Sequence, residues 1–462
     1  MIETNYTPPS DKTFLGHPKG LFLLFFTELW ERFSYYGMRG ILMYYLTKAV
    51  INGGIGFEDQ TAYLIYGVFT GLVYFTPLIG GWLADKYIGQ RKSITIGGVT
   101  MMLGQFVLFL FNTELGLFAG LILLIIGNGF FKPNISTLVG GLYKQGDPKR
   151  DAAFSIFYMG INVGAFIAPL IVGLLTDNLF ASFDKSGEIT KFGYRYGFLA
   201  ASIGMLLGQI LYSTLSKKYL GDLGVKAAGA KVKVGEVNEN NKPLTKEEKQ
   251  RTLTIFVYFF FAIFFFAGFE QAGSSIAIYV DRYVDRTVGD FLIPATWFQS
   301  INPLFIILLT PLFVVFWPSK FGRGITTPVK MGSGLVLLGI GFFFMLGAIS
   351  DRGGDVADMA IKASMWWVIF TFLLHTIGEL CLSPIGLSTV TKLAPPKLAS
   401  FLMGVWLLSS TFGNFMASGI ASATSSMGSG SVYAVLSGGA IVCGVALICL
   451  NKVLLKMMYG VR

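Results

Sequence analysis

The chain has 462 residues, of which 53% are hydrophobic, 15% are aromatic and only 13% are charged. A soluble domain of this size carries about 25% charged residues, so the composition excludes a soluble protein and indicates a protein that crosses a membrane several times. The net charge of +10 does not indicate nucleic-acid binding, because the basic residues are divided among short loops between apolar runs.

The first 20 residues are polar and precede an apolar run from Leu21 to Val50. This run is too long and too charged for a signal peptide and lacks a small-residue cleavage site, so we expect it to remain as the first membrane helix. Twelve segments reach the roughly 20 residues that a helix needs to cross a bilayer. They cover residues 21–50, 60–84, 93–112, 115–143, 150–176, 196–216, 252–281, 297–317, 327–349, 363–391, 399–422 and 431–457. We therefore predict an all-α membrane protein with twelve transmembrane helices.

The one long polar interruption, residues 217–251, is rich in Lys, Gly, Glu and Asn and contains no apolar run. It predicts a solvated linker between two six-helix halves, an N-terminal bundle over 1–216 and a C-terminal bundle over 252–462. Most of the 36 basic residues lie on the side that holds this linker and both chain ends. By the positive-inside rule we expect the linker and both termini to be cytoplasmic.

Charged side chains also interrupt the apolar runs themselves, which is costly. The interrupting residues are Glu28, Glu31, Arg32, Arg39, Lys132, Glu270 and Glu379. A charge at the centre of a membrane helix costs about 2.5–3.5 kcal/mol on insertion scales, so such residues usually mark function. They occupy only the first, fourth, seventh and tenth spans. If each group of three helices is one repeat, the first helix of every repeat lines the centre, where substrate binds near the bilayer midplane.

The first span carries the densest polar pattern. Positions 28, 31, 32, 35, 36 and 39 share one face of a helix that turns 100° per residue. This face must meet a cavity or partner charges, while the opposite, apolar face is able to meet lipid or other helices. For Glu28, Glu31 and Arg32, a purely structural ion cluster is the alternative to a functional one.

The fourth and tenth spans echo each other, because each contains a Gly and a Pro six residues apart, in Gly127–Pro133 and Gly378–Pro384. On this echo Lys132 and Glu379 lie about one turn apart in depth on opposed helices, which predicts an ion pair between the two halves. A proline removes one helical hydrogen bond, so each proline marks either a gate or a static bend.

The segment Glu28-x-x-Glu31-Arg32-Phe33-x-Tyr35-Tyr36-Gly37 resembles the ExxERFxYYG signature of the proton-dependent oligopeptide transporter family, which belongs to the major facilitator superfamily. Further similar segments are Gly81–Lys86 with Gly89–Lys92, Phe157–Gly164, Phe269–Gln271, Gln299–Pro303 and Gly378–Glu379. The resemblance spans the whole chain and implies the major facilitator fold. One departure is that many bacterial relatives carry two extra helices between the halves, for which 217–251 has no room.

The resemblance also implies a role for individual residues. Arg39 and Lys132 would hold a peptide carboxylate, and Glu379 would receive the peptide amino group. Proton coupling would fall to Glu28, Glu31, Arg32 and Glu270. Hydrogen bonds to the peptide backbone would come from Tyr36, Tyr74, Asn162, Gln299 and Asn302, and side-chain pockets would be lined by Trp406 and Phe266. Without the family, Tyr74 and Trp406 would be interpreted as packing residues.

Elementary electrostatics agrees with this reading. A dipeptide is a zwitterion, so fixed cations near one pole and an acid at the other match both of its ends, and the fork of an Arg suits a carboxylate. We therefore expect a symporter of di- and tripeptides with protons as the coupling ion, working as a monomer in the plasma membrane, here a bacterial inner membrane. No cofactor, metal or nucleic acid is expected.

Two other classes of function stay open on the sequence. The first is a major facilitator transporter of another small solute, such as nitrate, an amino-acid derivative or a drug. The second is a membrane receptor or enzyme. We find no appended signalling domain, Ser-His-Asp set, metal-ligand cluster or nucleotide-binding loop, and the chain has only two histidines. An enzyme is therefore not expected.

Overall fold

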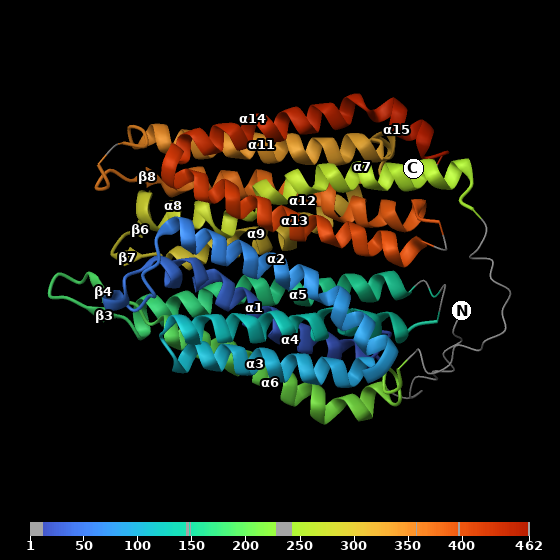
Figure 1. The fold of residues 1–462 in the computed structure, drawn as a ribbon, viewed down its shortest axis with the longest axis horizontal. Coiled ribbons are helices and arrows are strands. Elements are labelled where there is room, and N and C mark those ends of the chain that lie inside the picture. The colour runs from blue at the N-terminus through green and yellow to red at the C-terminus, as the bar shows by residue number, and fades with distance from the viewer. Residues whose placement is uncertain are drawn as a thin grey trace. The chain divides into compact units, whose positions relative to one another are not determined.

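Long helices dominate the computed structural model, which describes residues 13–144, 147, 149–227, 243–356, 358–395 and 398–460 (Figure 1). The helices up to residue 220 are α1 (Lys19–Thr47), α2 (Asp59–Leu83), α3 (Gln90–Leu110), α4 (Glu114–Gly141), α5 (Lys149–Leu174) and α6 (Tyr194–Leu220). The later helices are α7 (Lys246–Phe269), α8 (Ser275–Tyr283), α9 (Ile301–Phe316), α10 (Lys320–Gly324), α11 (Thr327–Asp351), α12 (Met365–Leu393), α13 (Ala399–Met427), α14 (Ser429–Cys449) and α15 (Asn451–Met457).

The strands are short and lie before α1 or in the connections between helices. They are β1 (Thr13–Phe14), β2 (His17–Pro18), β3 (Ser182–Phe183), β4 (Ile189–Lys191), β5 (Val284–Asp285), β6 (Thr287–Val288), β7 (Phe291–Leu292) and β8 (Ala363–Ser364). Three pairs are antiparallel (β1–β2, β3–β4 and β6–β7), and β5 pairs with β8 in parallel. The fold of the described chain therefore depends on packing between helices.

Each of the twelve predicted spans coincides with helical structure, so the prediction of an all-α membrane protein is confirmed. Within the described residues, ten helices are long and apolar enough to cross a membrane by length and composition. The other two are α1 and α13, each 29 residues long. The charged residues of α1 and the many Ser, Thr and Gly residues of α13 lower their hydropathy. Composition alone therefore undercounts the spans at the most polar helices.

The seventh predicted span, residues 252–281, lies within the helical stretch Lys246–Tyr283, and this stretch contains a break. The helix α7 ends at Phe269, a tighter 3₁₀ turn follows at Glu270–Gly273, and Ser274 leaves helical geometry with φ −124° and ψ −97° before α8 begins. Apolar periodicity continues through this break, and hydropathy therefore did not reveal it.

The described chain forms two compact units. One consists of Met1–Phe57 with Leu72–Val234, and the other of Glu58–Gly71 with Gly235–Arg462. The helix α2 thus contributes its first part to the second unit and its remainder to the first. Residues 228–242 of the predicted linker and both chain ends (1–12 and 461–462) lie outside the described residues, so the predicted halves and the predicted location of the termini stay predictions.

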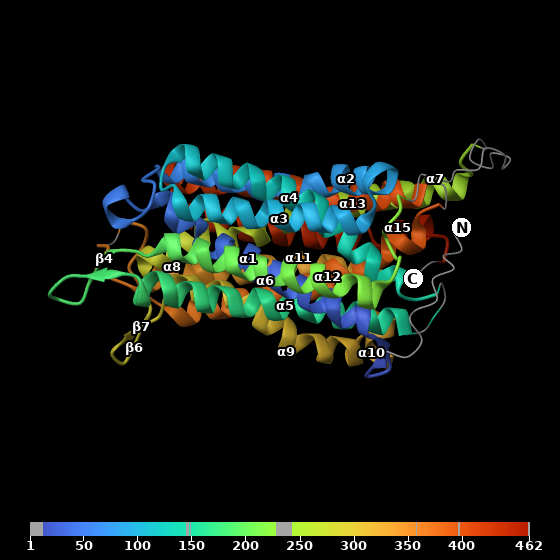
Figure 2. The same cartoon turned by 90° about the horizontal axis from the view of Figure 1, so that it is seen from below.

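Each unit is held by pairs of helices that lie side by side. In the first unit, α1 packs against α5 and α6, and α3 packs against α4 and α6 (Figure 2). In the second unit, α11 packs against α12 and α14, and α13 packs against α7. The start of α2 joins the second unit through Ser418 of α13, whose hydroxyl donates to the Tyr63 carbonyl at 2.8 Å, and through a bidentate ion pair of 2.6 and 2.7 Å between Arg282 and Asp59.

The two glycines of the sequence echo make equivalent contacts. A Cβ atom added at Gly127 of α4 would lie 2.7 Å from the carbonyl oxygen of Gly97 of α3, and one added at Gly378 of α12 would lie 2.7 Å from the carbonyl oxygen of Gly334 of α11. Glycine is required at these positions because the backbones of two membrane helices touch there. The spacing from each glycine to its proline thus accompanies the same helix–helix contact in both units.

These contacts predict that Gly127→Ala destabilises the protein by about 1–3 kcal/mol, the usual cost of overpacking. The added methyl group would collide with the backbone of Gly97, which has no flexible end to move. Thermal unfolding of the detergent-solubilised protein measures the loss. Gly438→Ala on α14 is the matched control, because no atom lies within 4 Å of the added Cβ. Equal melting temperatures for the two variants would contradict the assignment.

Candidate functional site

The charged residues of α1 form an ion cluster buried inside the first unit. The Nε atom of Arg32 lies 2.7 Å from Glu28 Oε1 and 2.7 Å from Glu31 Oε2. All three residues are at most 4% exposed. Glu28 and Arg32 are one helical turn apart, so the helix itself holds this pair together. A single guanidinium group therefore partners two carboxylates.

This cluster is incompletely satisfied. The Nε–H of Arg32 donates its hydrogen bond to Glu28, and the contact with Glu31 is an ion pair. Among the described residues, Arg32 Nη2, Glu28 Oε2 and Glu31 Oε2 have no hydrogen-bond partner. Buried polar atoms in this state are costly and rare. Their presence here, inside a predicted membrane span, favours a site of function over a static brace.

Two side chains of α4 extend the cluster. Asn128 donates from Nδ2 to Glu31 Oε1 at 3.4 Å, and Lys132, one turn further along α4, places its Nζ atom 4.2 Å from the ring centroid of Tyr74 on α2. A cation over an aromatic ring is favourable, above all where water is scarce. The same face of α4 thus connects the acids of α1 to the aromatic ring of α2.

The remaining predicted residues of the first unit are Tyr36, Arg39 and Asn162. Tyr36 and Arg39 are half-buried on α1, and the Tyr36 ring meets the ring of Tyr35 edge-on with centroids 5.3 Å apart. Asn162 is buried on α5, where its Nδ2 donates to the Tyr158 carbonyl of the preceding turn at 3.0 Å. Its amide oxygen is the part of the side chain that this contact leaves for another donor.

In the second unit, the structure brings two predicted residues into direct contact. Asn302 on α9 donates from Nδ2 to Glu379 Oε2 on α12 at 3.1 Å and to the Thr376 hydroxyl at 3.0 Å. Glu270, in the same unit, is only 6% exposed. The second unit therefore holds two acids predicted inside the membrane, with an amide oriented toward one of them.

Glu270 lies in the break between α7 and α8, and amide side chains hold this break open. Gln271 donates from Nε2 to the carbonyls of Ala267 and Ala417 at 3.1 and 3.0 Å. Gln299 donates from Nε2 to the Ala272 carbonyl at 2.6 Å. The bond from Gln271 to Ala417 ties the break to α13, and the bond from Gln299 ties it to the segment that precedes α9. Gln299, which we expect to contact a peptide, also donates a hydrogen bond to the backbone at this break.

The two predicted pocket residues are packed against glycines. Trp406 of α13 is 5% exposed, and its ring atom Cζ2 lies 2.1 Å from where a Cβ atom of Gly386 on α12 would be. Phe266 of α7 is half-buried, with its Cβ atom 2.4 Å from the Cβ position of Gly413 on α13. The Trp406 ring therefore fills space that the absence of a side chain at Gly386 creates, and the backbone of α7 at Phe266 closely approaches Gly413 of α13.

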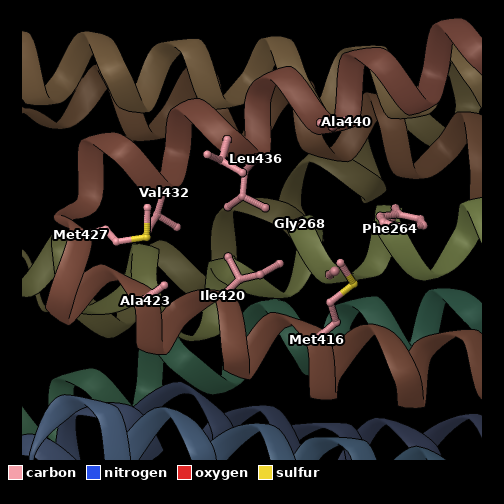
Figure 3. A pocket seen from close by; sticks show the side chains of 12 residues that line it. Phe264, Gly268, Met416, Ile420, Ala423, Met427, Val432, Leu436 and Ala440 are labelled. Atoms are coloured by element: carbon pink, nitrogen blue, oxygen red, sulfur yellow. The ribbon is translucent and has the colours of Figure 1, made fainter.

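A separate cavity of about 260 Å³ lies among α7, α13 and α14 and does not include any of the predicted residues (Figure 3). Its lining side chains are apolar, among them Phe264, Met416, Ile420 and Leu436. Val435, which also lines it, is 68% exposed. An apolar lining offers no partner to a charged solute, so this cavity is not a candidate for the charged site.

Sequence reasoning missed three contributors: Asn128, Thr376 and Gln271. For Asn128 a signal was available, because it lies four residues before Lys132 and so shares its helix face. Thr376 likewise lies three residues before Glu379. The predicted ion pair between Lys132 and Glu379 joins residues of different units and stays a prediction.

Comparisons with known proteins agree with these observations. The sequence profile described as the POT family (PTR2) matches residues 91–220 and 209–435. An uncharacterized transporter, YclF, of Bacillus subtilis is 35% identical over 97% of both chains, and a di-/tripeptide transporter of Lactococcus lactis subsp. cremoris is 32% identical over 98% of this chain and 99% of its own. The crystal structure of a peptide transporter POT in complex with sulfate superposes with a TM-score of 0.87 at 33% identity, covering 97% of both chains.

These matches cover nearly the whole chain, and the solved relative has the same helical fold over its full length. The relatives are transporters, which excludes an enzyme and confirms a membrane protein that crosses the bilayer several times. The chain belongs to the POT family of transporters and has the major facilitator fold.

Proposed function

We propose that this protein takes up di- and tripeptides together with protons, by alternating access. The peptide carboxylate binds near Arg39 and Lys132, and the peptide amino group binds near Glu379. The di-/tripeptide transporter of Lactococcus, which this chain matches over nearly its whole length, supports this substrate class.

The observation that carries the proposal is the division of intramembrane charge between the units. Within the described residues, all the bases predicted inside the membrane (Arg32, Arg39 and Lys132) belong to the first unit, and the second unit contributes only acids, Glu270 and Glu379. The negative carboxylate of a zwitterionic peptide suits the bases of the first unit, and its positive amino group suits the acids of the second. Arg32 is paired with Glu28 and Glu31. Arg39 lies further along the same helix, and its forked guanidinium group suits a carboxylate.

Proton coupling is supported by the excess of acid at two places. Glu28 and Glu31 share one guanidinium group, and the second unit holds Glu270 and Glu379 with none of the bases predicted inside the membrane. An uncompensated negative charge is expensive in an apolar medium, and binding a proton removes it. A proton at Glu31 or Glu270 would therefore change which cations are available to substrate.

The other predicted residues complete the proposed site. Backbone hydrogen bonds to the peptide fall to Tyr36, Tyr74, Asn162, Gln299 and Asn302, and side-chain pockets are lined by Trp406 and Phe266. We propose further that the protein works as a monomer without a cofactor, in a bacterial inner membrane, with both termini in the cytoplasm.

Alternating access requires contacts that break. The first part of α2 belongs to the second unit and the remainder to the first, so we take the contacts at the start of α2 as candidates. At its first residue, Asp59 is held to Arg282 by two hydrogen bonds of 2.6 and 2.7 Å. A planar, bidentate pair of this kind is the strongest class of exposed ion pair, so it is a suitable latch.

The proposed substrate is tested by competition in proteoliposomes. Di- and tripeptides should displace one another and should stimulate proton uptake, whereas free amino acids should do neither. Displacement by nitrate or by amino-acid derivatives in place of peptides would favour another small solute, and the absence of any solute-driven proton movement would overturn the proposal.

Glu270→Gln should abolish the response of uptake to a pH gradient while exchange of peptide across the membrane continues. The amide cannot take up a proton, but it keeps the shape of the carboxyl group. Uptake with and without an imposed gradient, alongside counterflow, measures this difference. Glu114→Gln, at an exposed acid in the first turn of α4, is the control and should behave as the wild type. Gradient-driven uptake by Glu270→Gln would contradict the assignment.

Glu379→Gln should weaken binding of dipeptides by about tenfold or more, since a hydrogen bond to a charged group contributes about 1.5–3 kcal/mol. The effect depends on the peptide amino group. Competition by N-acetylated dipeptides should therefore be the same for the variant and the wild type, which makes these peptides an internal control. An equal loss for both kinds of peptide would show that Glu379 acts on structure and not on the amino group.

Asp59→Asn should open the end of the protein at which α2 begins. The reporter is a cysteine at Ser418, a residue only 5% exposed, in a background from which Cys381, Cys443 and Cys449 are removed. Labelling by a membrane-impermeant maleimide should become several-fold faster in Asp59→Asn, and the charge-exchanged pair Asp59→Arg with Arg282→Asp should slow it again. Unchanged labelling in all three proteins would exclude a latch.

A further inference from the structure

A groove of the first unit lies between α1 and α6. It has a volume of about 270 Å³, and its walls are apolar, including Phe22 and Phe26 from α1 and Leu211 and Leu215 from α6. Phe26 is 47% exposed, so the groove opens outward, where the membrane surrounds a helix of this kind. These walls offer only carbon to an occupant. An acyl chain fits that chemistry, and a peptide does not.

One end of the groove is basic. Lys19, the first residue of α1, lines it together with Tyr219 of α6. The neighbouring Lys217 and Lys218 are exposed in the last turn of α6, and Lys218 Nζ lies 5.4 Å from the Tyr219 ring centroid. Asp222, just beyond the helix, is the nearest acid in the sequence. Lys19 and Lys218 therefore place two ammonium groups at the mouth of the groove, and Lys217 lies beside Lys218 on the exposed side of the same turn.

The two helix ends meet closely at this edge. A Cβ atom added at Gly20 would lie 2.9 Å from Leu220 Cδ2 and 3.1 Å from the Tyr219 carbonyl oxygen. Lysines that begin one membrane helix and end its antiparallel neighbour lie at the depth of lipid headgroups, where long basic side chains reach for phosphate. The groove and its basic edge are therefore arranged in the order of a phospholipid, with chain below and headgroup above.

The hairpin of β1 and β2 adds apolar surface at the same end. Its turn residues, Leu15 and Gly16, both have positive φ, at 50° and 77°. Leucine seldom adopts this conformation, and here it leaves Leu15 76% exposed beside Phe14, which is 54% exposed. In water this arrangement is unfavourable for two reasons, the strained backbone of Leu15 and the exposure of two apolar side chains. It becomes favourable if the tip of the hairpin rests among lipid headgroups and the first carbons of their chains.

Contacts with the helices hold the hairpin in place. His17 Nδ1 lies 2.8 Å from the Tyr143 hydroxyl, Lys149 Nζ donates to the Gly16 carbonyl at 3.2 Å, and the ring of Phe14 meets that of Phe22 edge-on at 4.9 Å between centroids. Phe14 itself lines the groove. The hairpin is thus part of the groove wall.

We propose that the α1/α6 groove binds a phospholipid with an anionic headgroup. One acyl chain lies between Phe22, Phe26, Leu211 and Leu215, and the headgroup phosphate is held by Lys19 with Lys217 and Lys218. The β1–β2 hairpin covers the chain where it meets the headgroup. This inference goes beyond peptide transport and does not depend on it.

The test uses the full chain in detergent, titrated with phosphatidylglycerol, with phosphatidylcholine of the same chains, or with inorganic phosphate. Thermal unfolding should shift upward with phosphatidylglycerol, less with phosphatidylcholine and not with phosphate. Each of Lys19→Ala, Lys217→Ala and Lys218→Ala should weaken the apparent affinity for phosphatidylglycerol about fivefold, since a lysine near an anionic surface contributes about 1 kcal/mol. Native mass spectrometry of the wild-type protein should retain phosphatidylglycerol in preference to phosphatidylcholine, which gives a readout that needs no variant.

Two further variants separate the groove from general surface charge. Leu215→Trp fills the groove and keeps all three lysines, and it should also reduce the shift. Lys320→Ala with Lys452→Ala removes two exposed lysines elsewhere and should leave the shift unchanged. The proposal is overturned if the two lipids stabilise equally, if phosphate alone reproduces the shift, or if the control loses as much as the groove variants.

Discussion

The cost of placing charge in an apolar medium is the constraint on which the rest of this structure depends. A membrane helix with two acids and two arginines is stable only if these charges are compensated nearby. The α1 helix does so by spacing Glu28 and Arg32 one turn apart and by folding Glu31 onto the same guanidinium group. The compensation is partial, because one base serves two acids. Asn128 on the neighbouring helix α4 adds a hydrogen bond to Glu31. The positions of α1 and α4 are therefore linked by this polar contact as well as by packing.

Much of the fold was predictable from the sequence because membrane helices obey a simple rule of length and hydropathy. All twelve spans lie where the apolar runs predict them, and the charged face of α1 was identified from spacing alone. The ExxERFxYYG segment identified the family, since it combines costly charges with a fixed glycine. The echo between Gly127–Pro133 and Gly378–Pro384 was also informative: both glycines turn out to lie where two backbones touch.

The rest was not accessible, for physical reasons that differ from residue to residue. Hydropathy does not reveal the break at Glu270–Gly273, because the chain stays apolar on both sides of this short 3₁₀ turn. At the break, Gln271 donates hydrogen bonds to backbone carbonyls. The hydrogen bond from Gln299 to the Ala272 carbonyl at this break was likewise not evident from the sequence. The grouping of Glu58–Gly71 with later helices depends on contacts such as Ser418 with Tyr63, which join residues more than 350 positions apart.

The contact between Gly97 and Gly127 has a mechanical consequence. No side chain separates the two backbones at this contact. Because the contact is between rigid backbone atoms, a displacement of α3 toward α4 also displaces α4. Asn128, the next residue along α4, carries the amide that reaches Glu31. A displacement of α3 therefore also moves Asn128 and changes its hydrogen bond to Glu31. Two glycines at the contact make this mechanical coupling rigid.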